Sequence, residues 1–183
     1  MRVEPMLTAR LLSRWRGASW RRRVGFAGWA ALVSALTGLG VVTAAGRYRV
    51  SWDPQVARCL PDMHAALIDL ADRAVGHGTI VAFRAEPEQA PFVPGQLIGK
   101  IVVGLPGDRV EVTPERTTVN GVVVGYGLLL AARTPRPAVS LTRDLVVPRG
   151  TVWAMGATAD SYDSRYWGPL PLWQVVGRVH VLW

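Results

Sequence analysis

The chain contains one lysine, Lys100, among 21 basic residues. The others are arginines, whose guanidinium groups stay protonated near neutral pH, whereas a lysine ammonium can lose its proton when burial disfavours the charged form. Lys100 lies in an apolar, β-branched run, residues 97–103, that precedes a Pro-Gly turn. Such a run is typical of a strand. Lys100 is therefore a candidate general base, the alternative being a surface lysine without a chemical role.

The chain also contains one cysteine, Cys59, which has no intramolecular disulfide partner. A thiol beside a base is a nucleophile for acyl transfer, but a lone cysteine is also commonly a small buried hydrophobic residue. The residues alone leave both interpretations open. The separation between Cys59 and Lys100 leaves room for two strands between nucleophile and base. His64 offers a weaker Cys–His alternative.

Two sequence blocks resemble those of type I signal peptidases, proteases in which a neutral lysine activates a serine nucleophile. Residues 99–108, Gly-Lys-Ile-Val-Val-Gly-Leu-Pro-Gly-Asp, resemble the lysine box of that family, and residues 161–168, Ser-Tyr-Asp-Ser-Arg-Tyr-Trp-Gly, resemble its C-terminal box. The resemblance extends from about residue 47 to residue 183. It implies a mainly β fold, in which a signal-peptidase-like β domain follows one N-terminal transmembrane helix.

The nucleophile motif is most similar to that of the TraF-like branch of this family, which processes proteins of conjugative transfer systems. Cys59-Leu60-Pro61 resembles the Ser-apolar-Pro motif of that branch, with Cys in place of Ser. Ser51 is an alternative nucleophile, because Ser51-Trp52-Asp53-Pro54 matches the Ser-x-x-Pro of the broader family. The strand predicted at residues 65–70 follows Cys59 closely, which favours Cys59 over Ser51.

The resemblance also implies supporting residues. Ser161 matches the hydroxyl that holds the catalytic amine, and Asp163 and Arg165 match a structural ion pair near the site, the alternative for that pair being a solvated salt bridge. Besides the cysteine, the sequence departs from the family in two places. Ala57 lacks the hydroxyl that often completes the oxyanion hole, and Gly-Ala-Thr-Ala at residues 156–159 replaces Gly-Asp-Asn-Arg. These departures concern activity rather than the fold.

Residues 24–45 form an uncharged stretch of 22 residues, long enough to cross a bilayer as a helix. Residues 1–23 contain seven arginines and one glutamate, so they carry +6 of the net charge of +8. A basic tail before an apolar helix predicts a cytoplasmic N-terminus and an extracytoplasmic remainder. Because the basic charge is concentrated in this tail, a nucleic-acid-binding domain is disfavoured.

Two other interpretations of the N-terminal region remain open. Thr-Ala-Ala at residues 43–45 is a small-residue site at which a signal peptide could be cleaved, although the apolar run exceeds the usual length of such peptides. Arg-Arg-Arg at residues 21–23 weakly resembles a twin-arginine signal. We favour an uncleaved anchor.

Residues 46–183 are predicted to form one extracytoplasmic β peptidase domain. Its sequence alternates short β-branched runs with Gly- and Pro-containing turns, and Asn120-Gly121 between two such runs predicts a hairpin. Residues 110–150 are interpreted as this hairpin and a reduced form of the variable insertion of the family. The three histidines lack metal-ligand spacing and no phosphate-binding loop is present, so no cofactor is expected.

The sequence thus predicts a membrane-anchored endopeptidase of the bacterial inner membrane. Its expected substrate is an exported precursor, such as a propilin, of a conjugative transfer or related secretion system. The expected dyad is Cys59, or Ser51, with Lys100. One alternative is a housekeeping signal peptidase I. Another, of a different class, is a catalytically inactive structural component of a transfer apparatus.

The charge distribution makes a testable prediction of topology. Alkaline phosphatase fused after the last residue should be active, because the basic tail keeps the N-terminus in the cytoplasm and places the C-terminus outside. β-Galactosidase fused at the same position should be inactive and serves as the control. An active β-galactosidase fusion with inactive alkaline phosphatase would contradict this orientation.

Overall fold

The computed structural model describes residues 20–52, 59–60, 63–134 and 138–182. Most of the predicted basic tail, and Ala57, lie outside these residues. The chain divides into two units, Met1–Gly46 and Arg47–Trp183.

The described part of the first unit is a single long helix, α2 (Trp20–Arg47). Its segment Arg22–Arg47 is long and apolar enough to cross a membrane, with a mean hydropathy of 1.7 and no side chains buried within the protein. The helix extends beyond the predicted residues 24–45 at both ends, because arginines tolerate helical conformation well. A helix of 28 residues spans about 42 Å, more than the hydrocarbon core of a bilayer.

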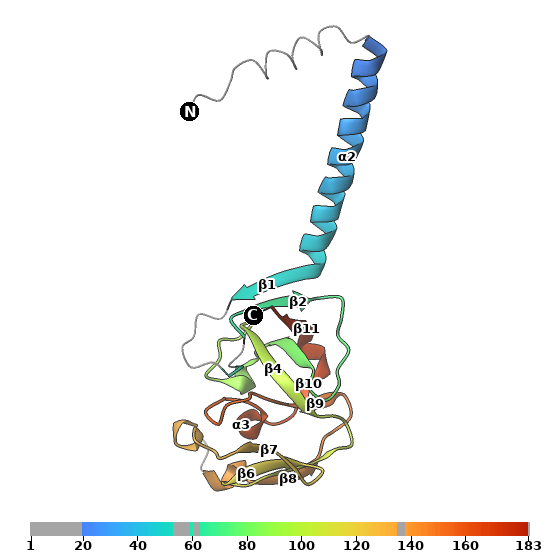
Figure 1. Cartoon of the computed structure of the whole chain (residues 1–183). Helices are drawn as coiled ribbons and strands as arrows, with labels where there is room; N and C mark the ends of the chain where they lie inside the picture. Colours follow the sequence, from blue (N-terminus) through green and yellow to red (C-terminus); the bar gives the residue numbers. More distant parts are fainter. Residues whose placement is uncertain (1–19, 53–58, 61–62, 135–137, 183) are drawn as a thin grey trace, which may run out of the picture. The chain divides into compact units, whose positions relative to one another are not determined.

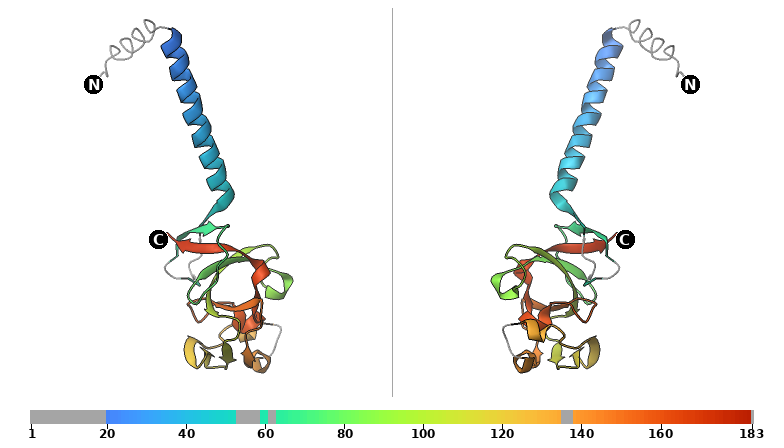
Figure 2. Two further views of the ribbon diagram at one scale, coloured as in Figure 1. Left: turned by 90° about the vertical axis from the view of Figure 1, so that its right-hand side faces the viewer. Right: turned by 90° about the vertical axis from the view of Figure 1, so that its left-hand side faces the viewer.

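The second unit consists of two antiparallel β-sheets (Figures 1 and 2). The larger sheet has the strand order β1-β2-β11-β3-β4-β9-β10. Its strands are β1 (Tyr48–Trp52), β2 (Ala65–Asp69), β3 (Ile80–Arg84), β4 (Leu97–Gly104), β9 (Thr151–Met155), β10 (Leu170–Pro171) and β11 (Val175–Val181). The fold is thus mainly β, as predicted.

The smaller sheet has the strand order β7-β6-β5-β8. Its strands are β5 (Arg109–Val112), β6 (Arg116–Val119), β7 (Val122–Tyr126) and β8 (Arg143–Val146). Between the strands lie the short helix α3 (Ser164–Trp167) and the 3-10 turns η1 (Pro87–Gln89), η2 (Ala131–Arg133), η3 (Ala138–Leu141) and η4 (Leu172–Gln174).

Most predicted strands are confirmed to within two residues. Besides the two-residue strand β10, two strands were not expected, namely β1, which lies between the apolar stretch and Cys59, and β8, which lies within the predicted reduced insertion. Neither shows a strong apolar alternation. Both are formed by pairing, β1 with β2 and β8 with β5, and local sequence patterns do not reveal such partners.

The predicted hairpin at Asn120-Gly121 is confirmed as the turn between β6 and β7. Asn120 has φ 51° and Gly121 has φ 82°. Two successive residues with positive φ are the requirement of a type I′ turn, whose twist matches that of the flanking strands. The hairpin makes β7 the edge strand of the smaller sheet.

Strand β4 places Lys100 in the interior. Along β4, buried residues alternate with more exposed ones, and Ile98, Lys100 and Val102 all belong to the buried set. Ile98 and Val102 are members of a hydrophobic cluster formed by the larger sheet. Strand β4 is paired with β3 on one side and with β9 on the other. Because this pairing fixes the register of β4, Lys100 cannot turn to the solvent-facing side of the sheet.

An ion pair at the edge of the larger sheet connects β2 with Arg47. Arg47 Nη2 donates to Asp69 Oδ2 over 2.6 Å, and Arg47 Nε donates to Oδ1 over 3.0 Å. These bonds from Arg47 lower the pKa of Asp69 to about 2, from an ordinary value of 3.8, although burial acts in the opposite direction.

This ion pair predicts a loss of stability in acid. The lowered pKa means that the Asp69 carboxylate stabilises the fold above about pH 4, and that this contribution is lost as the pH falls through about 2. Between these pH values, the free energy of unfolding of Asp69→Asn should therefore fall less than that of the wild type. Urea unfolding of the full chain in detergent measures the difference. Equal losses in the two proteins between these pH values would contradict this prediction.

Candidate active site

The amine of Lys100 is held by Ser161. Lys100 is 1% exposed and Ser161 is fully buried. Lys100 Nζ donates to Ser161 Oγ over 2.7 Å, although the two residues are 61 positions apart. Among the residues that the structure describes, no carboxylate forms an ion pair with Lys100. The structure therefore brings together the two residues that the resemblance pairs.

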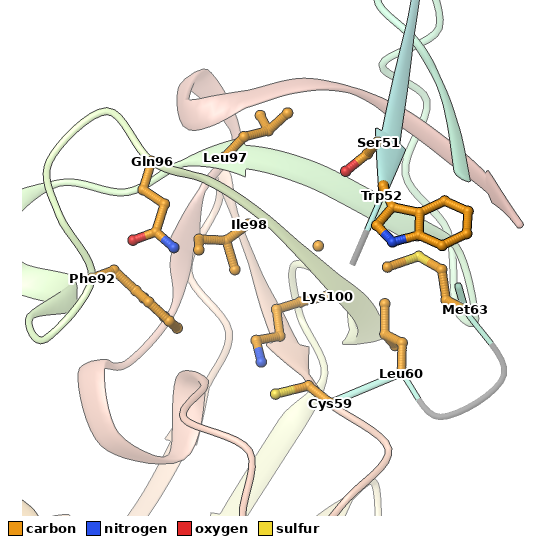
Figure 3. A pocket seen from close by; sticks show the side chains of 11 residues that line it. Ser51, Trp52, Cys59, Leu60, Met63, Phe92, Gln96, Leu97, Ile98 and Lys100 are labelled. Atoms are coloured by element: carbon orange, nitrogen blue, oxygen red, sulfur yellow. The ribbon is translucent and has the colours of Figure 1, made fainter. Parts of the chain in front are cut away.

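Cys59 and Lys100 line the same pocket, which has a volume of about 260 Å³. In Figure 3 the Cys59 sulfur and the Lys100 nitrogen point toward one another. The main chain of Cys59 is fixed by Ala157, whose N–H donates to the Cys59 carbonyl oxygen over 2.8 Å. The thiol is partly exposed, as a nucleophile must be to reach a substrate.

Ser51, the alternative nucleophile, lines the same pocket from β1. Figure 3 shows Ser51 beside Trp52, at the end of the pocket away from the Lys100 amine. Its hydroxyl is thus not placed beside the base in this arrangement. His64 is not among the described residues that line the pocket.

Apolar side chains form part of the remaining walls of this pocket, and the polar side chain of Gln96 lies among them. Leu60 and Met63 follow Cys59 in the chain, Ile98 comes from β4, and Phe92 comes from the loop before β4. The Phe92 ring packs edge-on against the Tyr162 ring, with 5.7 Å between centroids.

Gly156 is a site residue whose role was not recognised from the sequence. A side chain at this position would collide with Ser161, because its Cβ would lie 2.6 Å from Ser161 Cβ, and it would lie 3.1 Å from Cys59 Cβ. The absence of a side chain thus lets the segment after β9 pass close to both Cys59 and Ser161. The available signals were a glycine at the end of a predicted strand and its match to the first residue of Gly-Asp-Asn-Arg.

The ion pair of Asp163 and Arg165 lies in the interior. Their side chains are 0% and 1% exposed, so the alternative of a solvated salt bridge is wrong. Arg165 Nε donates to Asp163 Oδ1 over 2.8 Å, and Arg165 Nη2 donates to Oδ2 over 2.8 Å. The carboxylate also accepts the Gly156 N–H over 3.0 Å. The pair therefore holds the chain immediately beside Ser161 and Cys59.

Arg165 also connects separate segments through their main-chain carbonyls. Its Nη1 donates to the carbonyls of Tyr126 and Gly127 over 3.2 and 3.1 Å, and its Nη2 donates to the Ser161 carbonyl over 3.0 Å. Burial by itself lowers the pKa of Arg165, but the hydrogen bond and the charge of Asp163 outweigh it, so the pKa stands above its usual value. The guanidinium thus stays charged and ties the end of β7 to the Ser161 segment.

The sequence pattern of the signal peptidase family, peptidase S26, matches residues 25–183. The chain belongs to this family. The conjugal transfer protein TraF of Agrobacterium fabrum (strain C58) is 31% identical over 168 residues, which cover 84% of this chain and 90% of that protein. The chloroplastic thylakoidal processing peptidase 1 of Arabidopsis thaliana is 31% identical over 105 residues, covering 54% of this chain and 29% of that protein. A crystal structure of a signal peptidase I from Enterococcus faecalis V583 covers 60% of this chain and 99% of its own, with 26% identity and a TM-score of 0.39.

The burial of Arg165 predicts a large effect of its removal. Arg165→Ala should lower the free energy of unfolding by about 3–5 kcal/mol, because it leaves the Asp163 carboxylate buried and unpaired. Arg109→Ala is the matched control. Arg109 makes a similar pair of hydrogen bonds to Asp144, but both side chains are more than half exposed, so the loss should be at most about 1 kcal/mol. Equal losses in urea unfolding would contradict the structural role of Arg165.

Proposed function

We propose that this protein is a membrane-anchored endopeptidase that removes the leader of an exported precursor, such as a propilin, in a conjugative transfer or related secretion system. One observation carries this proposal. The only lysine of the chain is buried, bonded to Ser161 over 2.7 Å, and lines one pocket with the only thiol. Family membership and the similarity to TraF support the class of substrate.

In the proposed reaction, Cys59 Sγ attacks the carbonyl carbon of the scissile peptide bond, and the thiol proton passes to the Lys100 amine. The resulting tetrahedral intermediate collapses with cleavage of the C–N bond, and the leaving nitrogen takes the proton from Lys100. A thioester then joins the leader to Cys59. Water attacks this thioester with Lys100 again as base, which releases the leader as a carboxylic acid and restores the thiol.

The surroundings of Lys100 suit this role. In the proposed role Lys100 acts as an unprotonated amine, and none of the described carboxylates forms an ion pair with it. Ser161 Oγ accepts a hydrogen bond from Nζ, which orients the nitrogen lone pair relative to the pocket. Gly156 contributes by its lack of a side chain, since any substituent would press against Ser161 and Cys59.

The proposed location is the bacterial inner membrane. In this proposal, residues 1–23 are cytoplasmic, residues 24–45 cross the membrane once, and residues 46–183 form the peptidase domain on the periplasmic side. Helix α2 is consistent with such anchoring. The scissile bond of an exported precursor lies near the outer surface of the membrane, where an anchored peptidase meets it.

Processing by four enzyme forms tests the proposed dyad. Lys100→Arg keeps the positive charge but cannot supply a neutral amine, so the rate of precursor cleavage should fall by about 10²-fold or more. Cys59→Ala and alkylation of Cys59 by iodoacetamide should abolish cleavage, whereas Ser51→Ala should remain nearly as active as the wild type. The measurement is the rate of precursor cleavage by the full chain in detergent.

Four outcomes would contradict parts of this proposal. An inactive Ser51→Ala together with an active alkylated enzyme would reassign the nucleophile to Ser51. Wild-type activity in Lys100→Arg would exclude Lys100 as the base. A wild-type protein that cleaves neither a propilin nor a general secretory preprotein would favour the structural component, and preference for the general preprotein would favour a housekeeping signal peptidase.

A further inference from the structure

A second hollow of about 390 Å³ lies between β7 and the segment that follows β9. We refer to it as the β7 groove. The described residues that line it are Val123, Val124, Gly125, Tyr126, Met155, Gly156, Ala157, Thr158, Ala159 and Arg165. None of them lines the pocket that contains Cys59 and Lys100.

The β7 groove begins directly beside the proposed nucleophile. Ala157, in its wall, donates its N–H to the Cys59 carbonyl oxygen over 2.8 Å. Gly156, in the same wall, lies so close to Cys59 that an added Cβ would be 3.1 Å from the cysteine Cβ. Cys59 therefore lines one hollow and directly adjoins the wall of the other.

The opposite wall of the groove is an unpaired strand edge. β7 pairs with β6 on one side, and no described strand pairs with its other side. Figure 1 shows β7 between β6 and α3. Arg165 holds the end of this strand in place through its bonds to the Tyr126 and Gly127 carbonyls. A fixed, unpaired strand edge binds an extended peptide by adding it as a further strand.

The chemistry of the walls fits an uncharged occupant. Val123, Met155, Ala157 and Ala159 supply apolar and small surfaces, and the charge of Arg165 is already matched by Asp163. The Thr158 hydroxyl oxygen is buried and has no hydrogen-bond partner among the described residues.

We propose that the β7 groove binds the residues immediately after the scissile bond, as an extended segment with small apolar side chains. This inference rests on the proposed function, because a peptide held on one side of Cys59 by the first pocket must leave the site on the other side. The leader would occupy the first pocket, and the start of the mature chain would pair with β7. The groove thus selects precursors by the sequence that follows the cleavage point.

A binding experiment tests the groove without requiring catalysis. The full chain in detergent is mixed with millimolar Ala-Val-Thr-Val-Ala amide, and hydrogen exchange of its main-chain amides is followed by mass spectrometry. Exchange in residues 122–127 should slow in the wild type and in Val122→Arg, because residue 122 does not line the groove. Exchange should not slow in Val123→Arg, because residue 123 lines the groove and the arginine would obstruct it. Absence of protection in the wild type, or equal protection in the two variants, would overturn the proposal.

A kinetic experiment tests whether binding in the β7 groove speeds the cleavage of longer substrates. Two fluorogenic peptides share the leader sequence of the precursor, and one ends in an aminocoumarin while the other continues for five residues. The ratio of kcat/KM for the longer over the shorter peptide should fall about tenfold in Val123→Arg and stay unchanged in Val122→Arg. An unchanged ratio in Val123→Arg would refute the proposal that the groove binds the residues after the scissile bond. Failure of the wild type to cleave either peptide would refute the proposed function instead. In that case, the hydrogen-exchange experiment alone decides whether the groove binds peptide.

Discussion

The buried ion pair of Asp163 and Arg165 is the interaction on which the arrangement of this site depends. Removing two charges from water is costly, and the cost is offset only when every donor and acceptor finds a partner. Here the carboxylate accepts from the guanidinium and from the Gly156 N–H, while the guanidinium also bonds to carbonyls at the end of β7 and in the Ser161 segment. Displacement of any of these segments would leave a buried charge without its partners. The pair therefore acts as a fixed point around which Ser161, Gly156 and the edge of β7 are set.

Strand β4 positions the other part of the site, Lys100, through its pairing within the larger sheet. Its alternation places Lys100 where a hydrophobic side chain would otherwise lie, between Ile98 and Val102. The register with β3 and β9 prevents the strand from rotating the lysine outward. The amine thus meets Ser161 because two independent constraints, one from sheet pairing and one from an ion pair, bring their segments to the same place.

The sequence predicted the elements of the fold better than the contacts within the site. The apolar segment before residue 46, most strands and the turn at Asn120-Gly121 follow from local patterns, because length, alternation and positive φ are properties of short stretches. β1 and β8 could not be found in this way, since each depends on a partner strand. The contact of Lys100 with Ser161 was suggested by family resemblance, and no local pattern contains it. The role of Gly156 depends on the distance between two segments that only the folded chain brings together.

The isolation of Lys100 has a consequence for the chemical labelling of this protein. Reagents that acylate primary amines usually find many lysines on a protein surface, but here the only lysine is 1% exposed. In the folded chain such a reagent finds no exposed lysine amine. Amine-directed dyes and surface couplings would therefore leave the lysine side chain largely unmodified. Slow acylation of Lys100 would report entry of the reagent into the pocket that this residue lines.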